Sequence, residues 1–206
     1  MTVMAFDLAD YYRNPVMILG DGALGQMMEP VEFKASQVLP PEKPWAATGM
    51  RTRNNPNIIN SLYLQPDELE KHNIHLQKKY EQIQANEIRY EKIMTDDAEL
   101  VLVAYGITSR IARSAMEKAR NNGMKVGLFR PISLWPFPEQ ALATVANTAK
   151  KFLVVELSAG QLIEDVRLSV CGRCPIAFYG RTGGMIPSPQ AVYEQIVNIY
   201  EGKGGK

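Results

Sequence analysis

The residues best suited to hold an anion lie in a loop between a predicted strand and a predicted helix. Thr108, Ser109 and Arg110 follow directly on an apolar run that ends at Gly106. Two hydroxyls and a guanidinium at a helix N-terminus can bind a phosphate or a carboxylate. The loop lacks the Gly-x-Gly-x-x-Gly pattern of a dinucleotide site. Plain capping of the helix is the competing interpretation, and we favour it.

Glu156 is a second candidate, because it stands where a predicted strand meets its exit loop, Ser158 to Gly160. In open α/β sheets, ligands bind beyond the carboxyl ends of the strands. The Glu156 carboxylate can therefore serve a functional site, cap a neighbouring helix, or form an ion pair with Arg130 or Arg167. We favour the ion pair, since structural ion-pair networks also perturb carboxylates.

Two loops at the same predicted edge have the composition of contact surfaces. The ten residues from 129 to 138 contain three prolines and three aromatic residues, Trp135 among them. Proline neither continues a helix nor supplies an N–H to a sheet, so this connection is rigid. Its aromatic side chains either plug the end of the sheet or meet a partner. The loop Gly180–Gly184, which contains Arg181, can approach a partner backbone or an anion, and a tight turn is the alternative.

Two pairs of residues are potential metal ligands. Cys171 and Cys174 can form a redox dithiol, half of a zinc site, or neither. A zinc site needs two more ligands, and a thioredoxin-like dithiol opens a helix, whereas this pair closes one. His72 and His75 also lack a third ligand nearby in the sequence. We therefore expect no metal site in this chain.

Gly20-Asp21-Gly22 is followed by Asn54-Asn55, at nearly the spacing of the motifs with which many thiamine diphosphate enzymes hold Mg²⁺. Oxygen ligands from Asp and Asn suit this hard cation beside phosphates. The motif requires a compact strand–helix–strand between its two ends, and the prolines at 40–44 disfavour one. We therefore interpret Gly20-Asp21-Gly22 as a tight turn.

The composition is that of a soluble globular protein and gives no sign of binding to nucleic acid or to an anionic membrane surface. The hydrophobic fraction of 46% is ordinary, and the net charge of +1 argues against binding of nucleic acid. No apolar run approaches the roughly 18 residues of a membrane helix. Two cysteines among 206 residues fit a reducing compartment, so we expect a cytoplasmic protein.

The elements that must position these residues alternate regularly in the carboxyl half. We predict apolar strands at 99–106, 124–130, 152–157 and 176–179, with amphipathic helices at 111–119, 138–149, 162–170 and 189–200. Continuous apolar strands separated by helices are typical of a parallel sheet between two helical layers. The fold class is therefore α/β, a three-layer α-β-α arrangement with a mostly parallel central sheet.

The amino-terminal half is predicted to be less regular. A helix is expected at 2–12 and a buried strand at 16–19. The prolines between 30 and 56 leave no strand to pair with that one. A long, charge-rich helix is expected at 66–94, where Pro66 and two acids favour a helix start. Such a helix is too polar for a core and is typical of a link between domains or subunits.

Taken in order, these motifs resemble the carboxyl part of the alpha subunit of 2-oxoacid:ferredoxin oxidoreductases, in particular the 2-ketoisovalerate (branched-chain) type. The resemblance covers essentially the whole chain. The stretches that carry it are 18–22, 28–32, 105–119, 126–138, Glu156 with 160–162, and 180–184.

The resemblance implies an enzyme complex that oxidatively decarboxylates a 2-oxoacid to an acyl-coenzyme A and passes the electrons to ferredoxin. Thiamine diphosphate, Mg²⁺ and iron–sulfur clusters are the cofactors of the intact complex, and the first of these carries the chemistry. The implied partners are the beta and gamma or delta subunits, with a homodimer contact as well. The alpha subunit of that family begins with a thiamine-binding domain and continues into a transketolase C-terminal-like domain.

Residues 1–33 resemble the end of the thiamine-binding domain, whose earlier part we expect to be absent from this sequence. Residues 34–96 are predicted to form a Pro-rich linker and the long helix, 97–201 the transketolase C-terminal-like domain, and 202–206 a flexible tail. We therefore expect no catalytic, cofactor-binding or metal residue here.

The part of the subunit in this chain is predicted to serve structure and subunit assembly. The candidate anion or interface residues are Thr108, Ser109, Arg110, Trp135, Glu156 and Arg181. The alternative function, from another class, is a stand-alone α/β module that binds an anionic ligand. A redox role for the two cysteines is a third hypothesis, which we do not favour.

Overall fold

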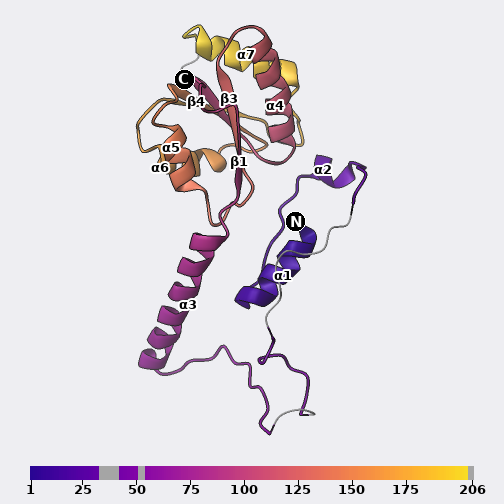
Figure 1. Ribbon diagram of the computed structural model, residues 1–206, viewed down its shortest axis with the longest axis vertical. Helices are drawn as coiled ribbons and strands as arrows, with labels where there is room; N and C mark the ends of the chain where they lie inside the picture. Colours follow the sequence, from indigo (N-terminus) through magenta and orange to yellow (C-terminus); the bar gives the residue numbers. More distant parts are fainter. Residues whose placement is uncertain (33–41, 51–53, 204–206) are drawn as a thin grey trace. The chain divides into compact units, whose positions relative to one another are not determined.

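The chain forms two compact units, seen in a computed structural model that describes residues 1–32, 42–50 and 54–203 (Figure 1). The first unit contains Met1–Gly20 and Met28–Ala85, and the second contains Asp21–Met27 and Asn86–Lys206. The predicted break at prolines 40 and 41, and the last three residues of the predicted tail, lie outside the described residues. None of the helices in the described part is both long and apolar enough to cross a bilayer.

The first unit contains helix α1 (Thr2–Tyr12) and most of helix α3 (Pro66–Asn86). The helix predicted at 2–12 is therefore confirmed. The Tyr12 side chain is buried, and the Lys79 ammonium donates to the Asn14 side-chain oxygen at 3.1 Å. Burial, and secondarily the charge of Arg13, lower the pKa of Lys79.

The buried strand predicted at 16–19 is wrong. These four residues adopt no regular secondary structure, and their side chains are 43 to 81% exposed. A strand exists only through pairing, and no described segment pairs with this one.

The long helix begins at Pro66 as predicted but ends at Asn86, not near residue 94. Tyr90–Ile93 instead form strand β1, which pairs antiparallel with strand β3 (Val126–Pro131). The side chains of β1 alternate between exposed and half-buried, which is the period of a strand at the edge of a sheet. Pairing with β3 thus overrides the charge-rich pattern that continues from the helix.

The second unit is built on one five-stranded sheet in the order β1-β3-β2-β4-β5, where β2 is Leu100–Val103, β4 is Lys151–Glu156 and β5 is Ile176–Gly180. The four strands β3, β2, β4 and β5 are mutually parallel. Four helices connect or follow them: α4 (Gly106–Asn121), α5 (Glu139–Val145), α6 (Leu162–Val170) and α7 (Pro189–Tyr200). The short helix α2 (Gly22–Gln26) also belongs to this unit.

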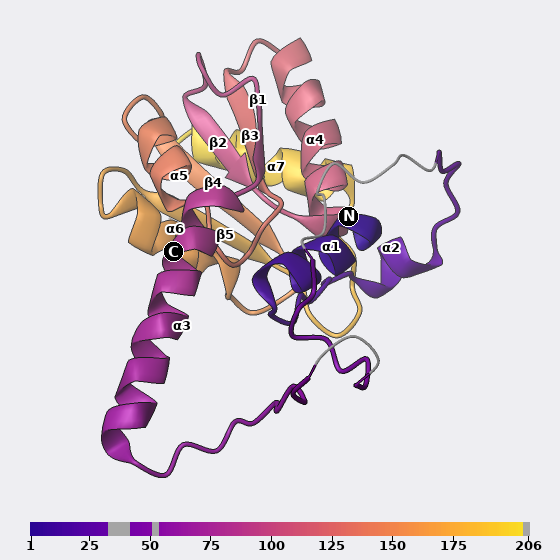
Figure 2. The same cartoon turned by 60° about the horizontal axis from the view of Figure 1, so that its bottom comes forward.

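The helices form two layers, one on each face of the sheet (Figures 1 and 2). Helices α4 and α7 pack together over one face, with Leu100 and Leu102 of β2 beneath them. Helices α5 and α6 pack over the other face, with Val101 and Val103 beneath them. Because β2 is buried on both faces, its sequence is a continuous apolar run. The predicted three-layer α/β class with a mostly parallel sheet is confirmed.

An ion pair at the amino end of the sheet predicts how this unit responds to acid. Arg120 donates two hydrogen bonds to Asp97, at 2.7 and 2.9 Å. This hydrogen bond lowers the pKa of the Asp97 carboxyl. The stabilisation is therefore complete above the pKa of the unfolded carboxyl, about 3.9, and is lost as the pH falls through the lower folded value. We expect Asp97→Asn to lose less stability than the wild type between neutral pH and strongly acidic pH, as measured by urea unfolding. An equal loss in both proteins would contradict this assignment.

Candidate functional site

The carboxyl edge of the sheet is the part of the second unit where a site is expected. Four helices begin there, because α4 follows β2, α5 follows β3, α6 follows β4 and α7 follows β5. Each leaves backbone N–H groups without partners inside the helix. The end of α7 is capped by the Ser188 hydroxyl, which accepts from Ala191 N–H at 3.1 Å, and the ends of α6 and α4 are filled by carboxylates.

Glu156, the last residue of β4, fills the N-terminus of α6. Its side chain is only 3% exposed. One carboxylate oxygen, Oε2, accepts from the N–H groups of Gln161 and Leu162 at 3.0 Å and from the Ser158 hydroxyl at 2.8 Å. The other, Oε1, accepts from Ile163 N–H at 3.0 Å. Glu156 is therefore a helix cap built into the strand end.

The favoured ion pair of Glu156 is wrong. Arg130 pairs instead with Glu91, at 3.1 Å, and Arg167 pairs with Glu164, at 2.5 Å. Both arginines are bound on the surface, whereas the Glu156 carboxylate is satisfied by backbone N–H groups inside the fold. Capping of a helix, the second of the three roles considered, is the one that the structure supports.

Asp21 fills the N-terminus of α4. Its Oδ2 accepts from Ile107 N–H at 2.8 Å, and its Oδ1 accepts from Leu24 N–H at 2.8 Å, in the first turn of α2. Gly106 gives the carboxylate room, since an added Cβ there would lie 2.6 Å from Oδ2. Both oxygens of Asp21 therefore serve helix ends, and Gly20-Asp21-Gly22 does not fit the Mg²⁺-binding role of the thiamine motif. The tight turn predicted for this stretch is wrong, since Asp21 is the N-cap of α2 and Gly22 is the first residue of that helix.

Thr108 and Ser109 are not caps of α4. The helix begins earlier, at Gly106, and both residues lie buried in its first turns. Their hydroxyls donate to the carbonyls of Tyr105 and Gly106, at 2.6 and 2.7 Å. Arg110 follows on the exposed side of the helix. An external anion at this helix end would have to replace the Asp21 carboxylate.

The carboxylates make this edge electrically negative around Tyr105. Burial raises the pKa of the Tyr105 phenol, and the charges of Glu156, Asp165 and Asp21 raise it further. Burial likewise raises the pKa of Asp165, with contributions from neighbouring glutamates.

The Trp135 loop is fixed by hydrogen bonds of the Ser133 hydroxyl and of two backbone N–H groups. Ser133 Oγ accepts from Arg89 N–H at 2.9 Å and donates to the Pro136 carbonyl at 2.7 Å. Ile132 and Ser133 also donate their N–H groups to the Arg89 carbonyl. The loop is thus tied to the segment before β1, while the Trp135 side chain stays 56% exposed. An aromatic side chain held out on a rigid loop is suited to meet a partner.

The loop after β5 also carries exposed apolar side chains at this edge. Arg181 N–H donates to the Glu156 carbonyl at 3.0 Å, so the loop begins by extending the pairing of β4 and β5. Gly183 and Gly184 both have positive φ, of 64° and 80°, as a turn requires. The Met185 and Ile186 side chains that follow are exposed.

The cysteines and histidines do not form a metal centre within the residues that the structure describes. Among them, no group of three or more His, Cys, Asp or Glu side chains is placed to hold an ion. Cys171 is the exposed C-cap of α6. Burial raises the pKa of the Cys174 thiol, which makes it a poorer nucleophile. His72 stacks on Tyr63, with ring centroids 4.4 Å apart.

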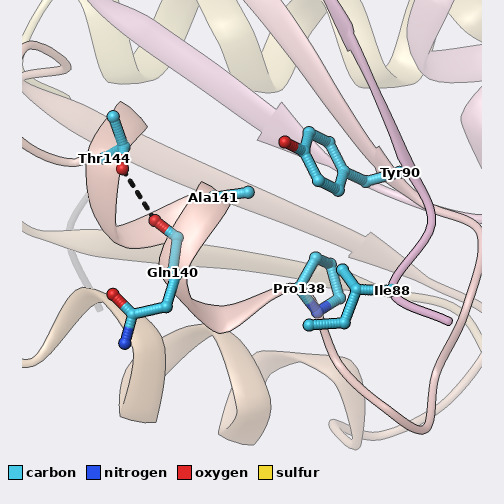
Figure 3. A pocket seen from close by; sticks show the side chains of 6 residues that line it. All are labelled: Ile88, Tyr90, Pro138, Gln140, Ala141 and Thr144. Carbon is cyan, nitrogen blue, oxygen red and sulfur yellow. Dashed lines mark hydrogen bonds between the residues drawn. The ribbon is translucent and has the colours of Figure 1, made fainter. Parts of the chain in front are cut away.

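A pocket of about 310 Å³ lies at the start of α5. Ile88 and Tyr90 line it from β1 and the residues before it, and Pro138, Gln140, Ala141 and Thr144 line it from the start of α5. Figure 3 shows the Thr144 hydroxyl bonded to the Gln140 carbonyl, at 2.8 Å, with the Gln140 amide turned away from Tyr90. The lining offers apolar contact and no acid–base pair, so we assign it no chemistry.

Sequence reasoning missed two residues that organise this edge, Asp21 and Ser133. A local signal existed for Asp21, since Asp three residues before an apolar residue is an N-cap pattern. Its second partner, Ile107, is 86 residues away. No periodicity in the sequence can reveal such a contact.

Comparison with known proteins shows which family this chain resembles. Residues 98–192 match the family described as pyruvate:ferredoxin oxidoreductase core domain II. The chain is 46% identical over 200 residues to ketoisovalerate oxidoreductase subunit VorB of Methanothermobacter thermautotrophicus, covering 97% of this chain and 56% of that one. Its identity to the subunit of the same name from Methanothermobacter marburgensis is 44%, with the same coverage. The chain thus spans little more than half the length of the curated relatives it matches.

A solved structure supports the fold. The chain superposes on 2-oxoglutarate:ferredoxin oxidoreductase from Magnetococcus marinus with a TM-score of 0.75 and 21% identity, covering 96% of this chain and 39% of that one. That protein was solved with 2-oxoglutarate, coenzyme A and succinyl-CoA bound. At this identity the likeness concerns the fold alone.

Proposed function

We propose, from the premise that this chain belongs to the 2-oxoacid:ferredoxin oxidoreductase family, that it is part of a subunit of a ketoisovalerate-type enzyme. The whole enzyme would oxidatively decarboxylate a branched 2-oxoacid to an acyl-coenzyme A and reduce ferredoxin in the cytoplasm. The observation that carries this proposal is the identity of 44 to 46% to two VorB subunits along 97% of the chain.

The role proposed for this part of the subunit is to support the assembly and not to supply reacting groups. At the carboxyl edge of the sheet, the carboxylates of Asp21 and Glu156 already accept helix N–H groups. Thiamine diphosphate, when bound in the intact complex, would supply the decarboxylation chemistry. The residues described here would hold the subunit's shape, and the Trp135 and Gly180–Gly184 loops would contact other subunits.

The stand-alone module for an anionic ligand is the weaker proposal. Its candidate residues are Thr108, Ser109 and Arg110 at the start of α4, and Arg181 in the loop after β5. Both hydroxyls are directed to backbone carbonyls, and Asp21 occupies the helix end.

Purified 1–206 is expected to show no binding of thiamine diphosphate with Mg²⁺ in isothermal titration calorimetry. The physical reason is that both carboxylate oxygens of Asp21, the acid of the Gly20-Asp21-Gly22 motif, accept N–H groups within the fold. Micromolar binding by this chain alone would contradict the assembly role.

The activity is tested with the full-length subunit reconstituted with its partner subunits. We expect reduction of ferredoxin to depend on coenzyme A and on a 2-oxoacid, with kcat/KM for 2-ketoisovalerate above that for 2-oxoglutarate. A preference for 2-oxoglutarate would place the enzyme with the 2-oxoglutarate synthases, to which this chain is 28% identical at most among the relatives compared.

A further inference from the structure

We infer that the N-terminus of α4 is a docking site for the segment Asp21–Met27, and that the Asp21 carboxylate is the latch that holds the segment there. The contact is internal to the second unit, which contains Asp21–Met27 although the residues on both sides, up to Gly20 and from Met28, belong to the first unit. The inference goes beyond the proposed activity and does not depend on which acid the enzyme oxidises.

Helix α4 has no cap of its own. Its N-cap residue is Tyr105, whose side chain makes no capping hydrogen bond, and its first turn contains no acid. A helix of 16 residues concentrates partial positive charge on its first N–H groups. The only side-chain carboxylate bonded to this end in the described residues is Asp21, through Ile107 N–H at 2.8 Å.

Helix α2 in turn depends on the contact. It has five residues and no buried side chain, and so short a helix is not stable in isolation. Its own cap is the other oxygen of Asp21, which accepts from Leu24 N–H. Leu24 also reaches the Gly106 backbone, where its Cδ1 would lie 3.9 Å from an added Cβ. One carboxylate therefore orders two helix ends at once.

Gly106 completes the fit. Its φ of +60° is the left-handed region, and the absence of a Cβ leaves space for Oδ2 of Asp21. Any other residue would strain the backbone and push the carboxylate away. The backbone of Tyr105, Gly106 and Ile107 thus leaves room for the Asp21 carboxylate, which belongs to the segment Asp21–Met27.

The test is amide hydrogen exchange of the ¹⁵N-labelled chain 1–206, resolved for single residues by NMR. In Asp21→Ala, exchange at both Leu24 and Ile107 should accelerate about tenfold or more, because each N–H loses a charged acceptor. Asp21→Asn has one acceptor oxygen, so only one of the two amides should keep its protection. The amide of Leu102, in the core strand β2, should be unchanged in both variants. Asp96→Ala, an exposed Asp-to-Ala change, is the matched control and should alter neither reporter amide.

Gly106→Ala approaches the same contact from the other side and covers the case in which Asp21→Ala does not fold. It should accelerate exchange at Ile107 by displacing an intact Asp21. If Ile107 keeps its protection in the Asp21 variants and in Gly106→Ala, the latch does not exist. Acceleration at Leu24 alone in Asp21→Ala would also overturn the inference, since Asp21 would then be only a local cap of α2.

Discussion

Replacing Glu156 by glutamine should lower the free energy of unfolding by about 3 kcal/mol. The carboxylate is buried and accepts from three backbone N–H groups and one hydroxyl. Glutamine has a single acceptor oxygen. Whichever way its amide is turned, an NH₂ group faces at least one of these donors, and the charge at the N-terminus of α6 is lost as well. Urea unfolding followed by circular dichroism measures the loss.

Glu164→Gln is the matched control for this prediction. Glu164 also lies in the first turn of α6, but its side chain is exposed and pairs only with Arg167 in the described contacts. Exposed ion pairs of this kind contribute about 0.2–1 kcal/mol. If the two glutamine variants lost the same free energy of unfolding, the buried Glu156 cap would contribute no more than an exposed ion pair, and the prediction would be wrong.

The layered fold could be predicted because its strands are buried on both faces. Strand β2 and residues 152–155 of β4 are continuous apolar runs, and a run of that kind is visible without any knowledge of its neighbours. Strand β1 could not be predicted in this way. Its residues Tyr-Glu-Lys-Ile include two charges and follow a charge-rich helix, so only the pairing with β3 identifies it.

The candidate site was predicted in position but not in role. Glu156 does stand at the carboxyl edge of the sheet, because the end of an apolar run marks the end of a strand. Its partners are backbone N–H groups, which every residue except proline carries and which no sequence pattern distinguishes. Arginines such as Arg130 and Arg167 are visible in a sequence as possible partners of a carboxylate, and the ion pair predicted from them is wrong.

Gly127→Ala should lower the free energy of unfolding by about 3 kcal/mol. Gly127 is the second residue of β3 and is buried, and the turn before β2 passes close to it. An added Cβ would lie 2.7 Å from the Met94 carbonyl oxygen and 3.0 Å from Thr95 Cα, both of them backbone atoms. Because backbone atoms cannot relieve the clash by a change of rotamer, either β3 or the turn before β2 has to move. The movement would disturb β1, which follows β3 in register up to Ile93.

Gly25→Ala separates this steric effect from the general effect of replacing glycine. Nothing lies within 4 Å of a Cβ added at Gly25, which is in helix α2. Alanine is the better helix former, so this change should be neutral or stabilising by up to about 1 kcal/mol.

Removing the third neighbour with Ala98→Gly should relieve Gly127→Ala only in part, because the Ala98 Cβ, at 3.0 Å, is farther than the Met94 oxygen. Full recovery in the double variant would show that a side chain, and not the crossing backbone, requires glycine in the strand. Urea unfolding of the four variants and the wild type decides between them.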